Sequence, residues 1–266
     1  MRPIWKGAVT FGLVYIPVKV YTATDQKDIK FHLLHSACRT PIRYRRYCPS
    51  CERDVGQEEL VRGYEYEKGR YVVLSEEELE NLPGLEARNV ALLDFVGRDE
   101  VNPLYYEKAY YLVPVEGGER VYELLRQAME RTKKAAVGRV AMRTKQSPAL
   151  LWPSGRALVM SLLYYPDEVR PAEVLPELSY NVHIHENELK MAESLISNLT
   201  APFEPAKYRD EYREALLEAI SRKIAGEEVA VPPPRAEKVV DLMEALKESI
   251  ELAKKERGAK KRGAGA

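Results

Sequence analysis

Cysteine and histidine are scarce in this sequence, with three and four residues among 266. Three cysteines, two of them only two positions apart, do not make the disulfide framework of a secreted domain. Long apolar runs are lacking too, because the longest, residues 8–18, contains Gly12 and Pro17 and is shorter than the roughly 20 residues that span a bilayer. That run also lacks a small-residue cleavage site, so we expect no signal peptide and no membrane partner. A reducing cytoplasm is the expected location.

Catalytic motifs are missing as well. The sequence has no phosphate-binding loop of the form G-x-x-x-x-G-K-[ST], no G-x-S-x-G elbow and no H-E-x-x-H pair. His183-x-His185, followed by Glu186 and Glu188, is the remaining alternative for a metal or acid–base site. A half-exposed strand leading into a helix is the favoured explanation of residues 183–188. We therefore predict that the protein is not an enzyme.

The chain has no excess of positive or negative charge, since 41 basic residues balance 41 acidic ones. The charges are nevertheless segregated along the chain. Residues 131–166 hold seven bases and no acid, residues 30–51 hold five bases and no acid, and residues 52–119 hold seventeen acids and seven bases. Attraction to a polyanion depends on the local field, so this segregation predicts a surface that binds nucleic acid.

The pattern of apolar residues predicts an α+β fold with a β-barrel core. Alternating, Val- and Tyr-rich segments are expected to form short strands at residues 9–21, 29–35, 60–66, 71–74, 90–96, 109–113, 136–144, 149–152 and 157–164. Ser75 and Glu78 predict the capping box of a short helix, and residues 119–131 predict an amphipathic helix whose apolar stripe includes Val121, Leu124 and Leu125.

The C-terminal third changes to helical periodicity at residues 186–198, 207–224 and 238–255. Three consecutive prolines, 232–234, predict a stiff extended spacer before the last of these helices. We expect a core with a bridging arm over residues 1–200, a helical arm over 201–231, and a tethered helix with a basic disordered tail over 232–266.

All three cysteines lie in one stretch, HSACRTPIRYRRYCPSC, residues 35–51. Its spacing, His35-x2-Cys38-x9-Cys48-x2-Cys51, resembles two knuckles that each supply two ligands to a tetrahedral zinc ion. Four protein ligands would close the coordination shell, so the predicted zinc is structural, within a clip at about residues 32–55. Three alternatives stay open: His32 in place of His35, a site without Cys38, and a redox pair at Cys48 and Cys51.

Basic residues inside the clip and near the second half of the predicted barrel are the candidate nucleic-acid contacts. Guanidinium groups suit phosphate oxygens, and bases alternating with apolar residues on a strand would share one exposed face. The candidates are Arg43, Arg45 and Arg46 in the clip, taken as a strand, and Lys133, Lys134, Arg139, Arg143 and Lys145 in the long basic run. An arginine-rich hairpin that only aids solubility is the alternative for the first group.

Several segments, taken in order along residues 1–255, resemble the prokaryotic Ku proteins of non-homologous end joining. They are RPIWKGAVTFGLVYIPVKVY at residues 2–21, FHLLH at 31–35, IRY at 42–44, the Cys48/Cys51 knuckle, LYYPDEVR at 163–170 and ELKMA at 188–192. The resemblance implies a nucleoid-associated homodimer whose barrels and bridging arms form a ring threaded by a double-stranded DNA end.

The resemblance further implies binding that is independent of sequence and a C-terminal part that recruits the bacterial multifunctional end-joining DNA ligase. It also implies a bridge that resembles a degenerate zinc ribbon. Two other hypotheses remain: a zinc-ribbon nucleic-acid-binding protein of transcription or RNA metabolism that needs no DNA end, and a zinc hydrolase that uses His183 and His185.

Overall fold

The computed structural model describes residues 1–80, 89–142, 145–226, 246–247 and 249–252. The chain divides into two compact units, Met1–Val174 and Leu175–Ala266. The expected domain boundary near residue 200 thus lies inside the second unit. No described helix has the length and apolar character that a membrane span requires.

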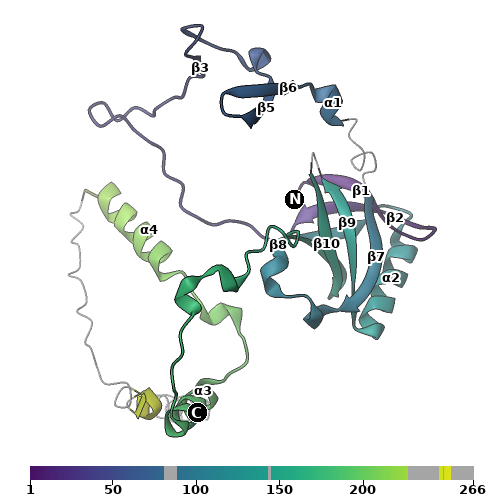
Figure 1. Cartoon of the computed structure of the whole chain (residues 1–266), viewed down its shortest axis with the longest axis vertical. Helices are drawn as coiled ribbons and strands as arrows, with labels where there is room; N and C mark the ends of the chain where they lie inside the picture. The colour runs from purple at the N-terminus through teal and green to yellow at the C-terminus, as the bar shows by residue number, and fades with distance from the viewer. Residues whose placement is uncertain (81–88, 143–144, 227–245, 248, 253–266) are drawn as a thin grey trace. The chain divides into compact units, whose positions relative to one another are not determined.

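Seven strands of the first unit form a closed barrel (Figure 1). Around the barrel the order is β1-β2-β8-β11-β10-β9-β7, and the closing pair, β1 with β7, is parallel whereas the other pairs are antiparallel. The strands are β1 (Trp5–Phe11), β2 (Val14–Thr22), β7 (Asn89–Gly97), β8 (Tyr106–Pro114), β9 (Lys134–Met142), β10 (Lys145–Ser154) and β11 (Ala157–Leu163). This confirms the predicted β-barrel core and the α+β class.

The barrel interior is filled by the apolar residues that alternate along these strands. On β2, for example, Ile16, Val18 and Val20 are fully buried. Where β9 pairs with β7, a Cβ on Gly138 would lie only 2.3 Å from the Ala91 carbonyl oxygen. A glycine is therefore required there by the backbone of the neighbouring strand, since no side chain fits at that distance.

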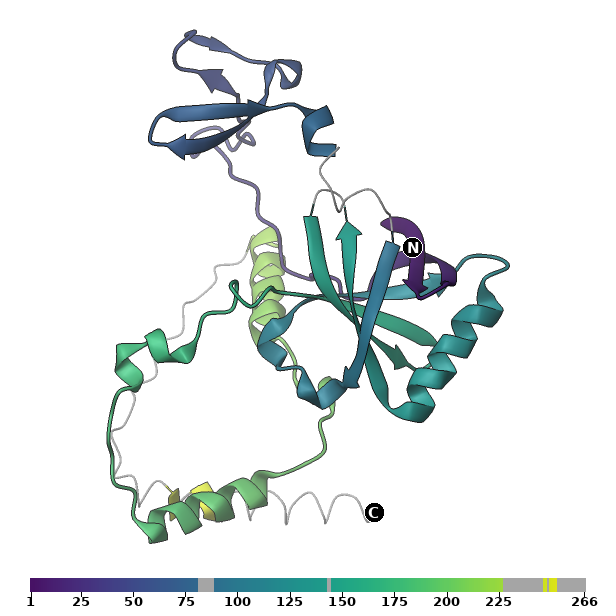
Figure 2. The same cartoon turned by 45° about the vertical axis from the view of Figure 1, so that its right-hand side comes forward.

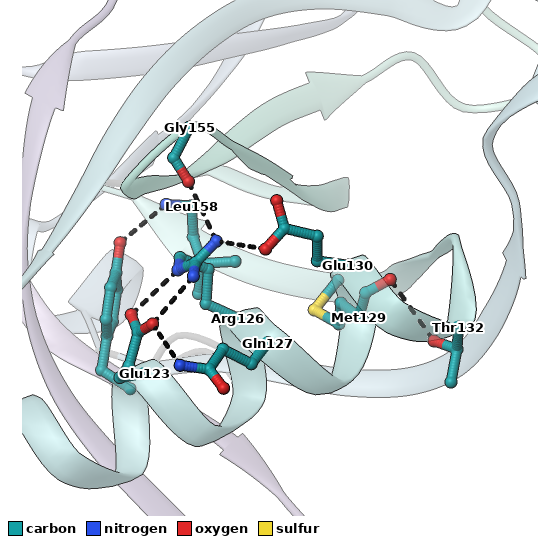
Figure 3. Close-up of polar contacts among 9 residues, drawn as sticks. Glu123, Arg126, Gln127, Met129, Glu130, Thr132, Gly155 and Leu158 are labelled. Atoms are coloured by element: carbon teal, nitrogen blue, oxygen red, sulfur yellow. Dashed lines mark hydrogen bonds and ion pairs between the residues drawn. The ribbon is translucent and has the colours of Figure 1, made fainter.

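Helix α2 (Glu119–Thr132) packs Tyr122, Leu125 and Met129 against the barrel core (Figure 2). Two polar anchors fix it. The Tyr122 hydroxyl donates to the Leu112 carbonyl at 2.7 Å and accepts from the Leu158 N–H at 2.6 Å. Arg126 donates to the Gly155 carbonyl and pairs with Glu123 and Glu130 at 2.8 Å, as Figure 3 shows. The amphipathic helix is confirmed, but its core-facing side is shifted from the predicted stripe, since Tyr122 is buried whereas Val121 and Leu124 are exposed.

Residues 23–88 are inserted between β2 and β7 and carry two small sheets of their own. One pairs β3 (Tyr47–Cys48) with β4 (Arg53–Asp54), and the other pairs β5 (Arg62–Glu67) with β6 (Arg70–Leu74). Helix α1 (Glu76–Glu80) begins at the predicted capping box, because the Ser75 and Glu78 side chains each accept from the other residue's N–H. We call residues 23–80 the inserted arm.

The strand expected at residues 29–35 is wrong. Only an isolated bridge between Leu34 and Pro41 forms there, and the large apolar side chains Phe31, Leu33 and Leu34 stay exposed. A strand needs a neighbour for its backbone groups, and this segment pairs with none beyond that bridge among the described residues.

The second unit contains α3 (Glu186–Leu199) and α4 (Glu211–Ile224), and neither helix buries a residue. The first matches the expected helix, and the second begins four positions later than expected because Asp210 caps it by accepting from the Arg213 N–H. Short 3-10 helices occupy Gln57–Glu59, Arg98–Glu100, Pro103–Tyr105, Ala172–Val174, Pro176–Leu178 and Pro205–Lys207. The triple proline, the basic tail and most of the last expected helix lie outside the described residues.

Candidate nucleic-acid interface

The first knuckle of the expected zinc clip is a tight turn. The His35 N–H donates to the Thr40 carbonyl at 2.9 Å, and Arg39 adopts the left-handed conformation with φ of 57°. This turn places His35 Nδ1 3.1 Å from the Cys38 sulfur. Hydrogen bonds from Thr40, with a smaller contribution from His35, lower the pKa of the Cys38 thiol to about 7. The two side chains are therefore adjacent and suited to hold one metal ion together.

The second knuckle is the reversal between β3 and β4. Cys48 ends β3, Glu52 has φ of 52°, and the Cys48 and Cys51 side chains hydrogen-bond each other. Hydrogen bonds from the Cys51 backbone and thiol lower the pKa of Cys48, whereas the bond to Cys48 raises the pKa of Cys51. This pair also offers two adjacent sulfur ligands.

The two knuckles do not converge into one site. Throughout the described residues, which include all four predicted ligands, no three His, Cys, Asp or Glu side chains gather closely enough to hold a metal. Each half fits zinc chemistry separately, and the fourfold site stays a prediction. His183 and His185 lie edge to face with ring centroids 5.3 Å apart, and no described His, Cys, Asp or Glu joins them as a third metal ligand.

The clip arginines lie on an irregular segment and not on the expected strand, which starts only at Tyr47. Arg45 pairs with Asp54 at 3.1 Å and Arg46 donates to Gln57, whereas Arg43 has neither kind of partner within the described chain. All three side chains are exposed. An exposed ion pair contributes at most about 1 kcal/mol, so a phosphate can compete with Asp54 for Arg45.

The bases of the barrel do not form one patch. Lys133 ends α2 and Lys134 begins β9, whereas Lys145 begins β10 opposite Met142, about 25 Å away along β9. Arg139 is exposed in the middle of β9, and Arg143 lies outside the described residues. Lys145 therefore does not continue the strand that carries Arg139, because β9 ends at Met142 and Lys145 begins the antiparallel strand β10.

Lys145 is held in an ion pair with Glu168 at 3.1 Å. This hydrogen bond raises the pKa of Lys145, and hydrogen bonds from the Tyr165 N–H and then from Lys145 lower the pKa of Glu168. Lys134 has a weaker contact, 3.9 Å from Glu100. Both lysine side chains remain about half exposed, at 55% for Lys145 and 47% for Lys134.

Arg98 was not among the basic residues expected at the interface, because it lies in the acid-rich stretch of residues 52–119. Strands β7 and β9 pair Gly97 with Lys134, so the next residue, Arg98, lies beside Lys133 and Lys134. Its guanidinium stacks 4.6 Å above the Trp152 ring. No periodicity in the sequence indicates this neighbourhood, because it depends on strand register across 36 positions of chain.

Comparison with known proteins gives a consistent result. The model of the Ku70/Ku80 beta-barrel domain matches residues 10–191. Three relatives carry the name non-homologous end joining protein Ku. That of Symbiobacterium thermophilum is 48% identical over 97% of this chain, which spans only 65% of the relative's length. Those of Heliobacterium modesticaldum and Archaeoglobus fulgidus are 44% and 42% identical over 96% of this chain, which covers 93% and 100% of their lengths.

Proposed function

Because the chain belongs to the Ku family, we propose that it binds the ends of double-stranded DNA in non-homologous end joining. The observation that carries this proposal is the match of the whole barrel and of the C-terminal helices to relatives named for that process. The proposed role requires a grip on the DNA backbone and no catalytic step. Exposed arginines and lysines of the inserted arm and barrel are suited to phosphates and carry no sequence preference.

A ring-shaped homodimer is the proposed assembly. Its support is apolar surface that one chain leaves in water: α3 and α4 bury no residue, and Leu189, Ile196 and Leu199 are 48%, 67% and 61% exposed. The inserted arm likewise exposes Tyr64, Val72 and Val73 on both faces of the β5–β6 hairpin. Exposed apolar side chains gathered on one element are typical of surfaces that bind a partner protein.

We further propose a structural zinc ion held by His35, Cys38, Cys48 and Cys51, and a C-terminal contact with the multifunctional end-joining ligase. The two adjacent ligand pairs support the first proposal. The exposed helical unit supports the second. Truncation after residue 230 is expected to preserve DNA binding and to reduce stimulation of that ligase in an assay that joins linear duplexes end to end. Unchanged stimulation would place the contact in residues 1–230.

A gel-shift competition at fixed salt tests end binding. Labelled linear duplex is competed with the same sequence as an unlabelled linear fragment or as a closed circle. We expect only the linear competitor to displace the label, because a ring can load only where the duplex stops. Equal competition by circles, per base pair, would mean that the protein grips DNA from the side, as a zinc-ribbon nucleic-acid-binding protein would.

A further inference from the structure

An apolar groove runs beside α2, with a volume of about 490 Å³. Strand residues Phe11, Val14 and Phe95 line one wall, and Val121, Leu124 and Ala128 of α2 line the other. Leu124 is 69% exposed and Phe95 is 46% exposed. The volume lies within the range of small-ligand and peptide pockets in proteins, about 300–1,000 Å³.

Folding of the barrel does not account for this groove. The core takes Tyr122, Leu125 and Met129 from α2, while Val121, Leu124 and Ala128 form a second apolar stripe at spacings of three and four residues. Single exposed leucines are common on protein surfaces. Apolar side chains that share one concave surface instead indicate a binding site.

The groove is continuous with a basic pocket of about 190 Å³, because Met129 and Lys134 line both. Arg98 and Lys133 complete the positive charge of this pocket. Its acidic lining residue, Glu130, is already paired with Arg126 at 2.8 Å. Trp152 holds the Arg98 guanidinium in place, and no carboxylate lies within ion-pair distance of Arg98 in the described parts of the chain.

The groove is also preformed. Its helical wall is anchored by the Arg126 contact to the Gly155 carbonyl (Figure 3) and by the two hydrogen bonds of Tyr122. A rigid wall lowers the conformational cost of binding. Phe11 and Phe95 meet edge to face at 6.4 Å and stiffen the opposite wall.

We propose that this groove binds a short acidic-apolar peptide segment of a partner protein. Apolar side chains of the peptide enter between α2 and Phe95, and its acidic residues pair with Arg98, Lys133 and Lys134. A second copy of this chain fits less well, because a two-fold contact at this face would bring the same three bases against themselves.

This docking surface goes beyond the proposed DNA binding, and it assigns Lys133 and Lys134, two of the candidate DNA contacts, to the peptide.

Fluorescence anisotropy tests the proposal with a dye-labelled peptide in which leucine and phenylalanine precede a run of glutamates. We expect Leu124→Glu to weaken binding about tenfold or more, the loss that corresponds to one buried leucine. The matched control is Leu104→Glu, which changes an equally exposed leucine, 65%, outside the groove. The peptide with lysines in place of glutamates should bind weakly to the wild type and more tightly to Arg98→Glu with Lys133→Glu.

Methyl chemical shifts of Val14, Val121 and Leu124 locate the bound peptide directly. Shifts confined to these groups, with the charge reversal above, support the proposal. Binding that ignores peptide charge, shifts elsewhere on the barrel, or no binding to the wild type would overturn it. Dissociation of a dimer by Leu124→Glu, measured by sedimentation, would assign the groove to a second copy and also overturn it. DNA-end binding by Leu124→Glu is expected to equal that of the wild type, so the two proposals fail separately.

Discussion

Replacing Tyr122 by phenylalanine removes one hydroxyl that satisfies two backbone groups. The Leu112 carbonyl and the Leu158 N–H, which face each other across β8 and β11, both lose a buried partner. Each buried backbone group left without a partner costs about 1–3 kcal/mol. Part of that cost is offset, because phenylalanine avoids the free energy of burying a hydroxyl and because the two strands can move closer together. We expect a net loss of about 2 kcal/mol in the free energy of unfolding.

Urea and thermal unfolding followed by tryptophan fluorescence measure this loss. Both tryptophans, Trp5 and Trp152, lie in barrel strands, so the signal reports the first unit. For a unit of this size the melting temperature should fall by about 4–8 °C. Tyr111→Phe is the control, because the Tyr111 side chain is 41% exposed. Removal of its hydroxyl should change the free energy of unfolding by less than about 0.5 kcal/mol. A Tyr122→Phe effect as small as the control would refute the proposed anchoring role.

The same substitution should change the response to alkaline pH. Burial raises the pKa of Tyr122 above its ordinary value of 10. The neutral hydroxyl is therefore favoured by folding, so its contribution is complete below pH 10 and is lost as the pH rises through the folded pKa. The wild type should lose stability more steeply than Tyr122→Phe above pH 10; parallel curves would show that the hydroxyl is already open to water.

Three further variants test the zinc clip, the candidate DNA contacts of the arm, and the packing of the barrel strands. Cys48→Ser with Cys51→Ser should remove bound zinc and lower the melting temperature, and unchanged zinc content by plasma emission spectrometry would contradict the clip. Arg43→Glu with Arg45→Glu should weaken binding to every DNA sequence and reduce the salt slope by about 2, whereas a wild-type slope would place these arginines away from the DNA. Gly138→Ala should destabilise the barrel by about 3 kcal/mol or more, since its Cβ would overlap the Ala91 carbonyl; a loss below about 1 kcal/mol would mean that β7 yields easily.

Structural features that depend on residues close together in the chain could be predicted from the sequence. Alternating apolar residues indicated most barrel strands to within a few positions, the Ser75–Glu78 spacing indicated a helix start, and the Cys48-x-x-Cys51 spacing indicated a knuckle. The single strand expected at residues 9–21 is wrong, because the chain reverses at Gly12 and forms the antiparallel pair β1 and β2. The strand expected at residues 29–35 failed because apolar alternation reports a propensity and not the presence of a partner strand.

Burial on α2 illustrates the same limit for helices. The period of the sequence identified the helix and its apolar residues, but not which of them would face the barrel. Only packing decided that Tyr122 enters the core while Leu124 stays exposed in a groove.

The sequence by itself determined the barrel's strands, the two ligand pairs and the segregation of charge, because these follow from neighbours within a few residues. Tertiary structure alone decided where the charges lie. It placed Lys134 at the start of β9 and Lys145 beside the end of β9 on the next strand, and it brought Arg98 from an acid-rich segment beside Lys133 and Lys134. The physical reason is strand register, which is set by backbone pairing between residues far apart in the chain.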